Sequence, residues 1–175
     1  MNLTIRSEMP GDIDVIESLT RQAFSNAPHR DGNEHLIVNA LRQNGALTIS
    51  LVAELGGQVV GHVAVSPVTI TDRSQNWFGL GPISVLPDLQ RQGIGSALMR
   101  AALSALERHH ARGCVLVGDP QFYNRFDFRE SATLEYPGVP ATYLLVRLLK
   151  GSEPHGQISY NSAFQVSGTE SDRNE

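Results

Sequence analysis

The amino-acid sequence predicts one α+β domain (mixed α/β) in which helices flank a mixed, mostly antiparallel sheet. Two patterns of apolar residues with helical spacing precede a run of short strands joined by tight turns, which is typical of an antiparallel meander. A strand, a glycine-containing loop, a long helix and another strand then follow, and such a right-handed crossover makes its two strands parallel. The 175 residues suit one hydrophobic core.

The chain begins with a short strand and two helices, with a loop between the helices. Residues 3–6 form the strand, and the segment Pro10-Gly11-Asp12 marks a turn and a helix start. A helix is predicted over residues 12–26, because apolar residues recur there at spacings of three and four: Ile13, Ile16, Leu19, Ala23 and Ala27. A second helix is predicted over residues 33–42, and Asn44-Gly45 stops it.

Three strands are predicted next. Residues 49–55 and 58–70 form a hairpin around Gly56-Gly57, a sequence typical of a two-residue turn. Alternation in the second strand places two sets of side chains on opposite faces, Val59, Gly61, Val63 and Val65 on one and Val60, His62, Ala64 and Ser66 on the other. The third strand, residues 77–85, contains Pro82, which donates no ladder hydrogen bond. Pro82 therefore predicts a bulge, a sheet edge or a splayed gap.

The C-terminal part of the domain has a loop, a long helix and two further strands. Apolar patterns and glycines predict these elements: a loop over 87–93, a helix to about residue 111 that Gly113 ends, a strand over 114–117 buried on both faces, one or two helical turns over 121–126, and a final strand over 141–149.

The domain organisation follows from a change of composition near residue 150. We assign residues 1–150 to the domain. Residues 151–164 form a C-terminal extension that retains Ile158, Tyr160 and Phe164, and it is expected to pack either on the domain or on a partner chain. Residues 165–175 are polar and are expected to be a disordered tail.

The composition excludes several classes of protein. The formal net charge is −4, which argues against nucleic acid as the main partner. No apolar run approaches the ~18 residues that span a membrane, and the N-terminus lacks the pattern of a signal peptide. The single cysteine, Cys114, cannot form an internal disulfide and is expected to lie in the core. A cytoplasmic protein that binds neither nucleic acid nor membrane is therefore predicted.

The segment Leu89 to Ser96, between a strand and a helix, carries the strongest chemical signal. Gly93 and Gly95 let backbone N–H groups approach a ligand closely, the first helical turn adds free amides, and Arg91 adds a positive charge. A pyrophosphate fits this description, although a glycine-containing loop can also simply turn the chain. There is no P-loop, and Leu98 stands where a dinucleotide-binding G-x-G-x-x-G would need its third glycine.

The same segment resembles a known family. Gln90, Gly93 and Gly95 meet the pattern [Gln/Arg]-x-x-Gly-x-[Gly/Ala], which together with its apolar flanks resembles motif A of the GNAT superfamily of N-acetyltransferases. Residues 79–85 and 118–128 look like the corresponding segments of the bacterial YhbS-like N-acetyltransferases. The resemblance covers roughly residues 3 to 149. It implies a sheet splayed between two central parallel strands.

The resemblance further implies an acetyl-CoA-dependent N-acetyltransferase that acts by direct attack of an amine, with no metal. Strand backbone would pair with the pantetheine arm and loop amides would hold the pyrophosphate, which gives the CoA-binding set Ile83, Ser84, Val85, Gln90, Arg91, Gln92, Gly93, Ile94, Gly95 and Ser96. Tyr123 matches the family's tyrosine that hydrogen-bonds the CoA sulfur and protonates the departing thiolate. From the residues alone, the favoured interpretation of Tyr123 is one member of an aromatic packing cluster with Phe122, Phe126 and Phe128.

The group that removes the amine proton is left open between Glu34, His62 and Ser84. His62 in mid-strand also suits a hydrogen-bonded sheet histidine, and Glu34 near a helix start also suits the helix dipole. His109 and His110 are adjacent and face different sides of their helix, so they predict no metal site.

The amine acceptor is expected to be a small amine, an amino-acid derivative, or a lysine or N-terminus of a protein. The net negative charge favours a cationic acceptor. A monomer and a homodimer are both open. The alternatives are a non-catalytic acyl-CoA-binding or protein-interaction module on the same fold, and a nucleotide-binding protein without acyl chemistry. The presence of Tyr123 favours the enzyme.

Overall fold

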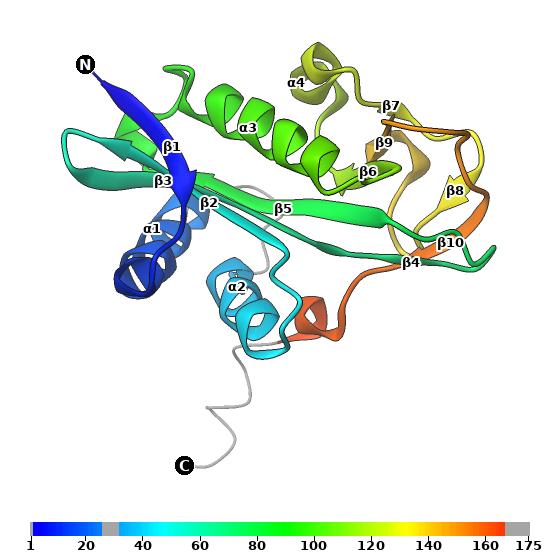
Figure 1. Cartoon of the computed structure of the whole chain (residues 1–175), viewed down its shortest axis with the longest axis horizontal. Coiled ribbons are helices and arrows are strands. Elements are labelled where there is room, and N and C mark those ends of the chain that lie inside the picture. The colour runs from blue at the N-terminus through cyan, green and yellow to red at the C-terminus, as the bar shows by residue number, and fades with distance from the viewer. Residues whose placement is uncertain (1, 26–31, 167–175) are drawn as a thin grey trace.

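Figure 1 shows the computed structural model of the chain, which describes residues 2–25 and 32–166. The α-helices are α1 (Ile13–Phe24), α2 (Glu34–Gln43), α3 (Ile94–Arg108) and α4 (Pro120–Tyr123). The strands are β1 (Leu3–Ser7), β2 (Ile49–Leu55), β3 (Gln58–Pro67), β4 (Thr69–Ile70), β5 (Trp77–Val85), β6 (Gly113–Val117), β7 (Arg129–Glu130), β8 (Leu134–Glu135), β9 (Leu144–Leu148) and β10 (Gly156–Ser159).

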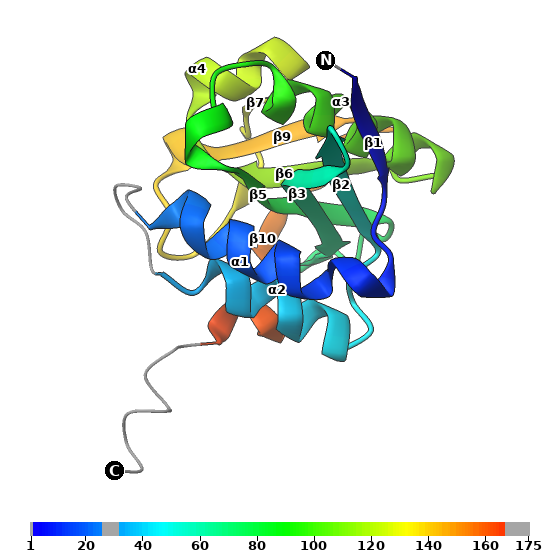
Figure 2. The ribbon, with the colours of Figure 1, turned by 90° about the vertical axis from the view of Figure 1, so that its left-hand side faces the viewer.

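The central sheet has seven strands in the order β1-β2-β3-β5-β6-β9-β7. Its central pair, β5 and β6, is parallel, while the neighbouring pairs run antiparallel. Helices α1 and α2 cover one face of the sheet and α3 covers the other, as Figures 1 and 2 show from two sides. The predicted α+β class, with a mixed and mostly antiparallel sheet between helices, is confirmed.

The two parallel strands separate after a short stretch of pairing. β5 pairs with β6 only from Trp77 to Gly79, but it continues to pair with β3 as far as Val85. From Leu80 onward, the edge of β5 that faces β6 therefore has no strand partner. The register between β3 and β5 also shifts, because Val63 pairs with Ile83 whereas Val65 pairs with Leu80. The irregularity therefore lies at Gly81 and Pro82. Both the bulge and the splayed gap that Pro82 predicts are present.

The predicted alternation of β3 is correct from Gly61 to Ser66 and wrong at its start. Val60 packs in the cluster beneath α3, whereas Val59 packs against the cluster of α1 and α2. The cause is an irregularity in the β2–β3 ladder, where Ala53 pairs with Gly61 and the next residue, Glu54, pairs with Val59. β3 has one extra residue at this bulge, so the side chains of Val59 and Val60 point to the faces opposite to those predicted.

Helix α3 ends earlier than the sequence suggests, and a different residue ends it. The last helical residue is Arg108, and His110 adopts the left-handed conformation (φ 57°) that terminates the helix. Gly113, the predicted stop, is the first residue of β6. Glycine is the usual residue at a left-handed position that ends a helix, so Gly113, three residues later, was the misleading signal.

Three other boundaries differ from the prediction. The first helix starts with a 3₁₀ turn at Pro10–Asp12, and the predicted strand over 58–70 divides into β3 and β4. The final strand starts at Leu144, because Ala141–Tyr143 form a 3₁₀ turn. Ala27 and most of the expected loop between α1 and α2 lie outside the described residues.

The segment after residue 150 packs on the body of the molecule. β10 lies between β4 and β8 in a small three-stranded sheet, with Ile158 buried. The Tyr160 ring then stacks between Tyr136 and Phe164, at centroid distances of 5.0 and 4.8 Å. Residues 156–165 thereby close the edge of the core next to α2. The predicted tail lies outside the described residues from 167 onward.

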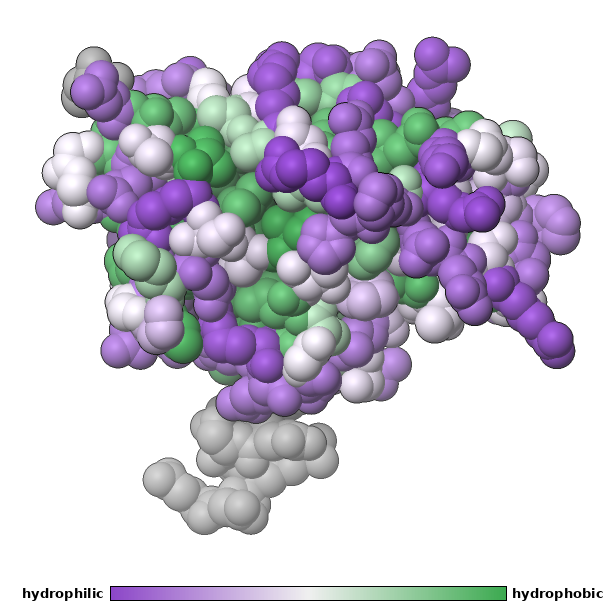
Figure 3. All heavy atoms as spheres, viewed as in Figure 1, coloured by the Kyte–Doolittle hydropathy of each residue, from purple (hydrophilic) through white to green (hydrophobic). Residues whose placement is uncertain are grey.

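One face of the molecule combines an apolar centre with a polar periphery. In Figure 3, which has the viewpoint of Figure 1, apolar residues gather near the middle of the face and hydrophilic residues cover most of its periphery. Among residues 2–25 and 32–166, no helix is both long enough and apolar enough to cross a bilayer.

Candidate active site

A cavity of about 630 Å³ opens between the splayed strands. Three segments form its walls, namely the end of β5, the loop that starts α3, and the turn around α4. The lining residues are Ile83, Ser84, Val85, Gln90, Arg91, Gly93, Gly95, Ser96, Phe122, Tyr123 and Arg125. Eight of the ten residues that the sequence analysis assigned to CoA therefore lie together with Tyr123 around one cavity.

The loop before α3 has the geometry of an anion site. Gly93 is the N-cap of α3 with φ 89°, a backbone conformation that glycine adopts without strain. The first hydrogen bond of the helix runs from the Ala97 N–H to the Gly93 carbonyl at 3.0 Å. The amides of residues 94–96 consequently have no partner within the helix, and they lie at the positive end of its dipole.

Gln90 and the two residues that do not line the cavity have structural roles. The Gln90 side-chain amide donates to the Val85 carbonyl at 3.1 Å, which ties the loop to the end of β5. Gln92 is exposed and donates to the Asp88 carbonyl. Ile94 is buried, and its side chain packs against Gly61 of β3.

Two arginines supply positive charge to the cavity. Arg91 was expected from the sequence, whereas Arg125 was not. The Arg125 guanidinium lies 4.9 Å from the centre of the Phe122 ring, so a cation–π contact holds it at the mouth of the cavity. The only sequence signal for Arg125 was its place in the same short helical segment as Tyr123.

Tyr123 is packed on several sides and also reaches the cavity. Its ring meets the edges of Phe122 and Phe128 at centroid distances of 4.8 and 6.2 Å, and a side chain at Gly118 would collide with it. Burial, with a smaller effect of Asp119, raises the pKa of Tyr123 to about 12. The phenol therefore stays protonated and is a hydrogen-bond donor. Tyr123 therefore belongs to the aromatic packing cluster and also lines the cavity.

His62 lies on the opposite face of the sheet from α3 and is fully buried. Its Nε2 atom is 2.8 Å from the Ser50 hydroxyl, and its Nδ1 atom has no hydrogen-bond partner among the described residues. Burial lowers the pKa of His62 to about 4. His62 does not line the cavity itself, but Ser84, directly opposite in the β3–β5 register, does.

Comparison with known proteins identifies the family. The sequence model of the acetyltransferase (GNAT) domain matches residues 47–130. The uncharacterized N-acetyltransferase YhbS of Escherichia coli (strain K12) is 33% identical over 151 residues, which are 83% of this chain and 87% of YhbS. The chain belongs to the GNAT family of acetyltransferases.

Solved GNAT structures share the whole fold. A GNAT family acetyltransferase from Brucella melitensis, in complex with acetyl-CoA, is 42% identical with a TM-score of 0.83, and the match covers 93% of this chain and 98% of that one. YhbS from Escherichia coli, in complex with CoA, is 31% identical with a TM-score of 0.86, covering 96% and 94%. GNAT membership makes the chain an acyltransferase and sets aside a nucleotide-binding protein without acyl chemistry.

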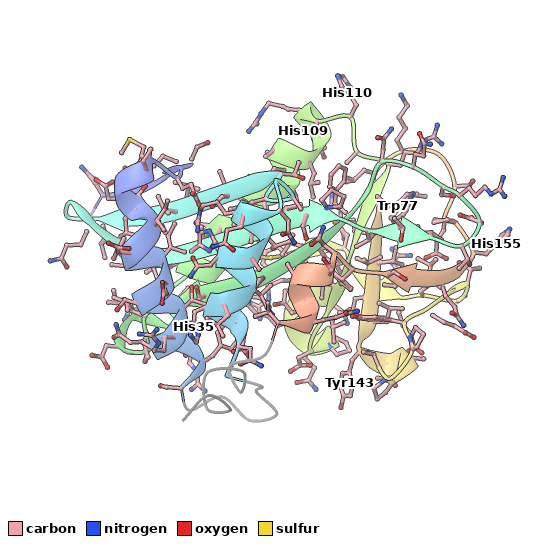
Figure 4. All side chains as sticks on the ribbon, turned by 90° about the horizontal axis from the view of Figure 1, so that it is seen from below. His35, Trp77, His109, His110, Tyr143 and His155 are labelled. Carbon is pink, nitrogen blue, oxygen red and sulfur yellow. The ribbon has the colours of Figure 1, made fainter. Side chains whose placement is uncertain are left out.

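The remaining candidate residues of this GNAT enzyme lie outside the cavity lining. Glu34 is the first residue of α2, and its Oε2 atom is buried without a hydrogen-bond partner among the described residues. Burial raises the pKa of the Cys114 thiol to about 12, so Cys114 is an inert core residue. In Figure 4, His35 and His155 lie far from each other and from the adjacent residues His109 and His110. No three His, Cys, Asp or Glu side chains in residues 2–25 and 32–166 gather to hold a metal.

The buried His62 makes the stability of this GNAT enzyme depend on pH. Its pKa is about 4 when folded, against an ordinary value of 6.5, so the unfolded chain binds more protons between these two values. This contribution is complete above pH 6.5 and is lost as the pH falls toward 4. From pH 7 to pH 5, we expect the free energy of unfolding to fall by about 2 kcal/mol more than in His62→Gln. Urea titrations at both pH values measure this difference, and equal losses in the two proteins would contradict it.

Proposed function

We propose that the enzyme transfers the acetyl group of acetyl-CoA to an amine by direct attack, without a covalent enzyme intermediate. The observation that carries this proposal is one cavity that the loop before α3, the end of β5 and Tyr123 line together. A long ligand with a diphosphate and a thioester fits such a cavity. The relatives crystallised with acetyl-CoA and with CoA support the same assignment.

The unpaired edge of β5 and the adjacent loop would bind acetyl-CoA. The backbone at Ile83 to Val85 lies beyond the last β5–β6 pair, and Gln90 already donates to the Val85 carbonyl. The other backbone groups on this open edge would pair with the pantetheine arm as an added strand. The amides of residues 94–96 and the Arg91 guanidinium would hold the pyrophosphate. Arg125 adds a second cation to this cavity.

The reaction needs one proton donor and one proton acceptor. The amine nitrogen attacks the thioester carbon, the carbon–sulfur bond breaks, and the sulfur leaves as a thiolate. The pKa of Tyr123, about 12, lies above the ~8.5 of an ordinary thiol. Tyr123 therefore stabilises the thiolate by a strong hydrogen bond. If the phenol gives its proton to the sulfur, the phenolate that remains must take up a proton before the next turnover. On the amine side, His62 and Glu34 are the candidates.

The acceptor is a primary amine of a small molecule or of a protein, and the net charge of −4 favours a cationic one.

We place the enzyme in a bacterial cytoplasm, because its one cysteine is buried and unpaired and its relatives are bacterial. Residues 1–150 would form the catalytic domain and 151–164 an extension that completes its core. A monomer and a homodimer are both compatible with this function. The position of Tyr123 at the cavity favours an enzyme over a non-catalytic acyl-CoA-binding or protein-interaction module on this fold.

The direct test is acetyl transfer to a panel of amines that includes amino-acid derivatives, polyamines and peptides with free lysine or N-terminal groups. We expect free CoA and acetylated amine to form in equal amounts, detected by thiol titration and mass spectrometry. Acetyl-CoA and CoA should also raise the melting temperature, whereas ATP should not. Stabilisation without transfer to any amine would favour the non-catalytic module.

Gly95 separates ligand binding from folding. A Cβ atom there would meet only Val85 Cγ2 at 4.0 Å, so a substitution fits the folded protein. We expect Gly95→Glu to weaken CoA binding ~100-fold or more, since the carboxylate repels the diphosphate, a loss of ~3 kcal/mol. Gly95→Ala is the matched control and should stay within a few-fold of the original affinity. Calorimetric titration measures both, and an unchanged affinity in folded Gly95→Glu would refute the proposed pyrophosphate site.

Tyr123→Phe tests the proton donor. The phenyl ring keeps its contacts with Phe122 and Phe128, so only the hydroxyl is lost. We expect kcat to fall by ~10²–10⁴ while the KM for acetyl-CoA changes little. A higher KM with unchanged kcat would show that the hydroxyl only anchors CoA. An original kcat would remove Tyr123 from the chemistry.

A further inference from the structure

A chain of four polar side chains crosses the face of the sheet that α1 and α2 cover. Arg42 of α2 donates from Nε and Nη2 to the two carboxylate oxygens of Glu8, at 3.0 and 2.9 Å. The Ser50 hydroxyl lies in short contact with Glu8 Oε1, and the same hydroxyl oxygen is 2.8 Å from His62 Nε2. The chain thus leads from the partly exposed ion pair to the buried imidazole.

The direction of each hydrogen bond follows from the charge of Glu8. Burial works against the ionised form, but the bonds from Arg42 and Ser50 outweigh it and lower the pKa of Glu8. An ionised carboxylate can only accept, so the Ser50 hydroxyl donates to Glu8. The Ser50 oxygen must then accept from the Nε2–H of His62. In neutral His62 the other nitrogen, Nδ1, therefore carries a bare lone pair.

That lone pair accepts no hydrogen bond from the described residues. His62 has no exposed surface, and Nδ1 has no donor among the described residues. Buried acceptors are nearly always hydrogen-bonded, so an orphan at such a position calls for an explanation in function. Glu34 Oε2 and Ser66 Oγ also have no hydrogen-bond partner within residues 2–25 and 32–166. Neither residue lines the cavity, and Ser66 lies opposite Gly79, which does not line it either.

Ser84 connects His62 to the cavity. It lines the cavity and lies directly opposite His62 in the β3–β5 register, where facing Cβ atoms are about 4.5–5.5 Å apart. The Ser84 hydroxyl is 3.3 Å from the Thr20 hydroxyl, and Thr20 donates its own proton to the Ile16 carbonyl at 2.7 Å. The Ser84 proton is therefore held only by one long hydrogen bond and is free to turn toward His62.

We propose that His62 accepts the proton of the attacking amine at Nδ1, through the hydroxyl of Ser84, and that Ser50 and Glu8 are positioning residues that fix its tautomer. The amine N–H passes its proton to Ser84 Oγ as Ser84 passes its own to Nδ1. The imidazolium that forms faces the Glu8 carboxylate through Ser50. The proton then returns to Tyr123 by way of solvent, so the transfer leaves no net proton change. This inference rests on the proposed acetyl transfer.

The kinetic test compares variants of the relay with a matched ion pair outside it. The control is Glu54→Gln, since Glu54 pairs with Arg6 at 2.8 Å and is partly exposed, as Glu8 is. With the best amine, we expect His62→Gln to lower kcat by ~10²–10⁴, the range for a lost proton-transfer group. Ser50→Ala and Glu8→Gln should lower kcat at least ~10-fold with the KM for acetyl-CoA unchanged. Ser50→Thr, which keeps the hydroxyl, and Glu54→Gln should stay near the original kcat.

A spectroscopic readout tests the relay without activity. Nitrogen-15 NMR of histidine-labelled protein at pH 7 should show His62 as the neutral tautomer with its proton on Nε2, and Ser50→Ala should lose this fixed state. A proton on Nδ1 in the unchanged enzyme would overturn the proposal.

The outcomes separate the inference from the proposed function. If the unchanged enzyme acetylates no amine, the proposed function and the reaction step fail together. If it does acetylate an amine and folded His62→Gln keeps the original kcat, only the relay is wrong, and a loss in Glu34→Gln would move the proton acceptor to α2.

Discussion

The incomplete pairing of β5 with β6 is the constraint on which the rest of the site depends. Three residues at the start of β5 hold the parallel pair together, and in the described part of the chain Leu80 to Val85 then keep β3 alone as a strand neighbour. Backbone groups left unpaired inside a protein are costly unless a ligand or water uses them. The open edge in the middle of this sheet is therefore suited to bind a ligand. Such a ligand would be extended and would carry polar groups that pair with the backbone of β5.

The crossover from β5 to β6 supplies the rest of the site at the same place. The chain leaves β5 at its open end, so the loop before α3 sits at the mouth of the gap, with Gly93 at its N-cap. It returns through β6, whose far end leads into α4 and places Tyr123 across the gap. The anion site and the phenol are thus brought together by the topology. Gly93 and Tyr123, which are far apart in the sequence, thus line one cavity.

The parts that the sequence predicted are those with local causes. The Gly56-Gly57 turn and Pro82 each act within a few residues, and the structure contains the hairpin and the irregular strand that they predicted. Gly93 likewise acts locally, as the N-cap of α3. The bulge that reverses Val59 and Val60 depends on the partner strand β2 and leaves no mark on β3 alone. The network of Glu8, Ser50 and His62 joins three separate elements, so only the folded chain shows which polar residues meet.

The two-residue period of a strand lets β5 serve both substrates of the proposed transfer. Val85 packs in the cluster beneath α3, and Ile83 packs against it, on the side where the loop amides lie. Ser84, between them, points to the opposite face, toward Thr20 and His62. A strand that pairs on both edges would have the backbone groups of these three residues occupied by its neighbours. Because β5 is open on one edge, a thioester laid along it would present one side to Tyr123 and leave the other toward Ser84 and Thr20. In the proposed transfer, the proton donor Tyr123 and the proton acceptor His62 would therefore lie on opposite sides of β5.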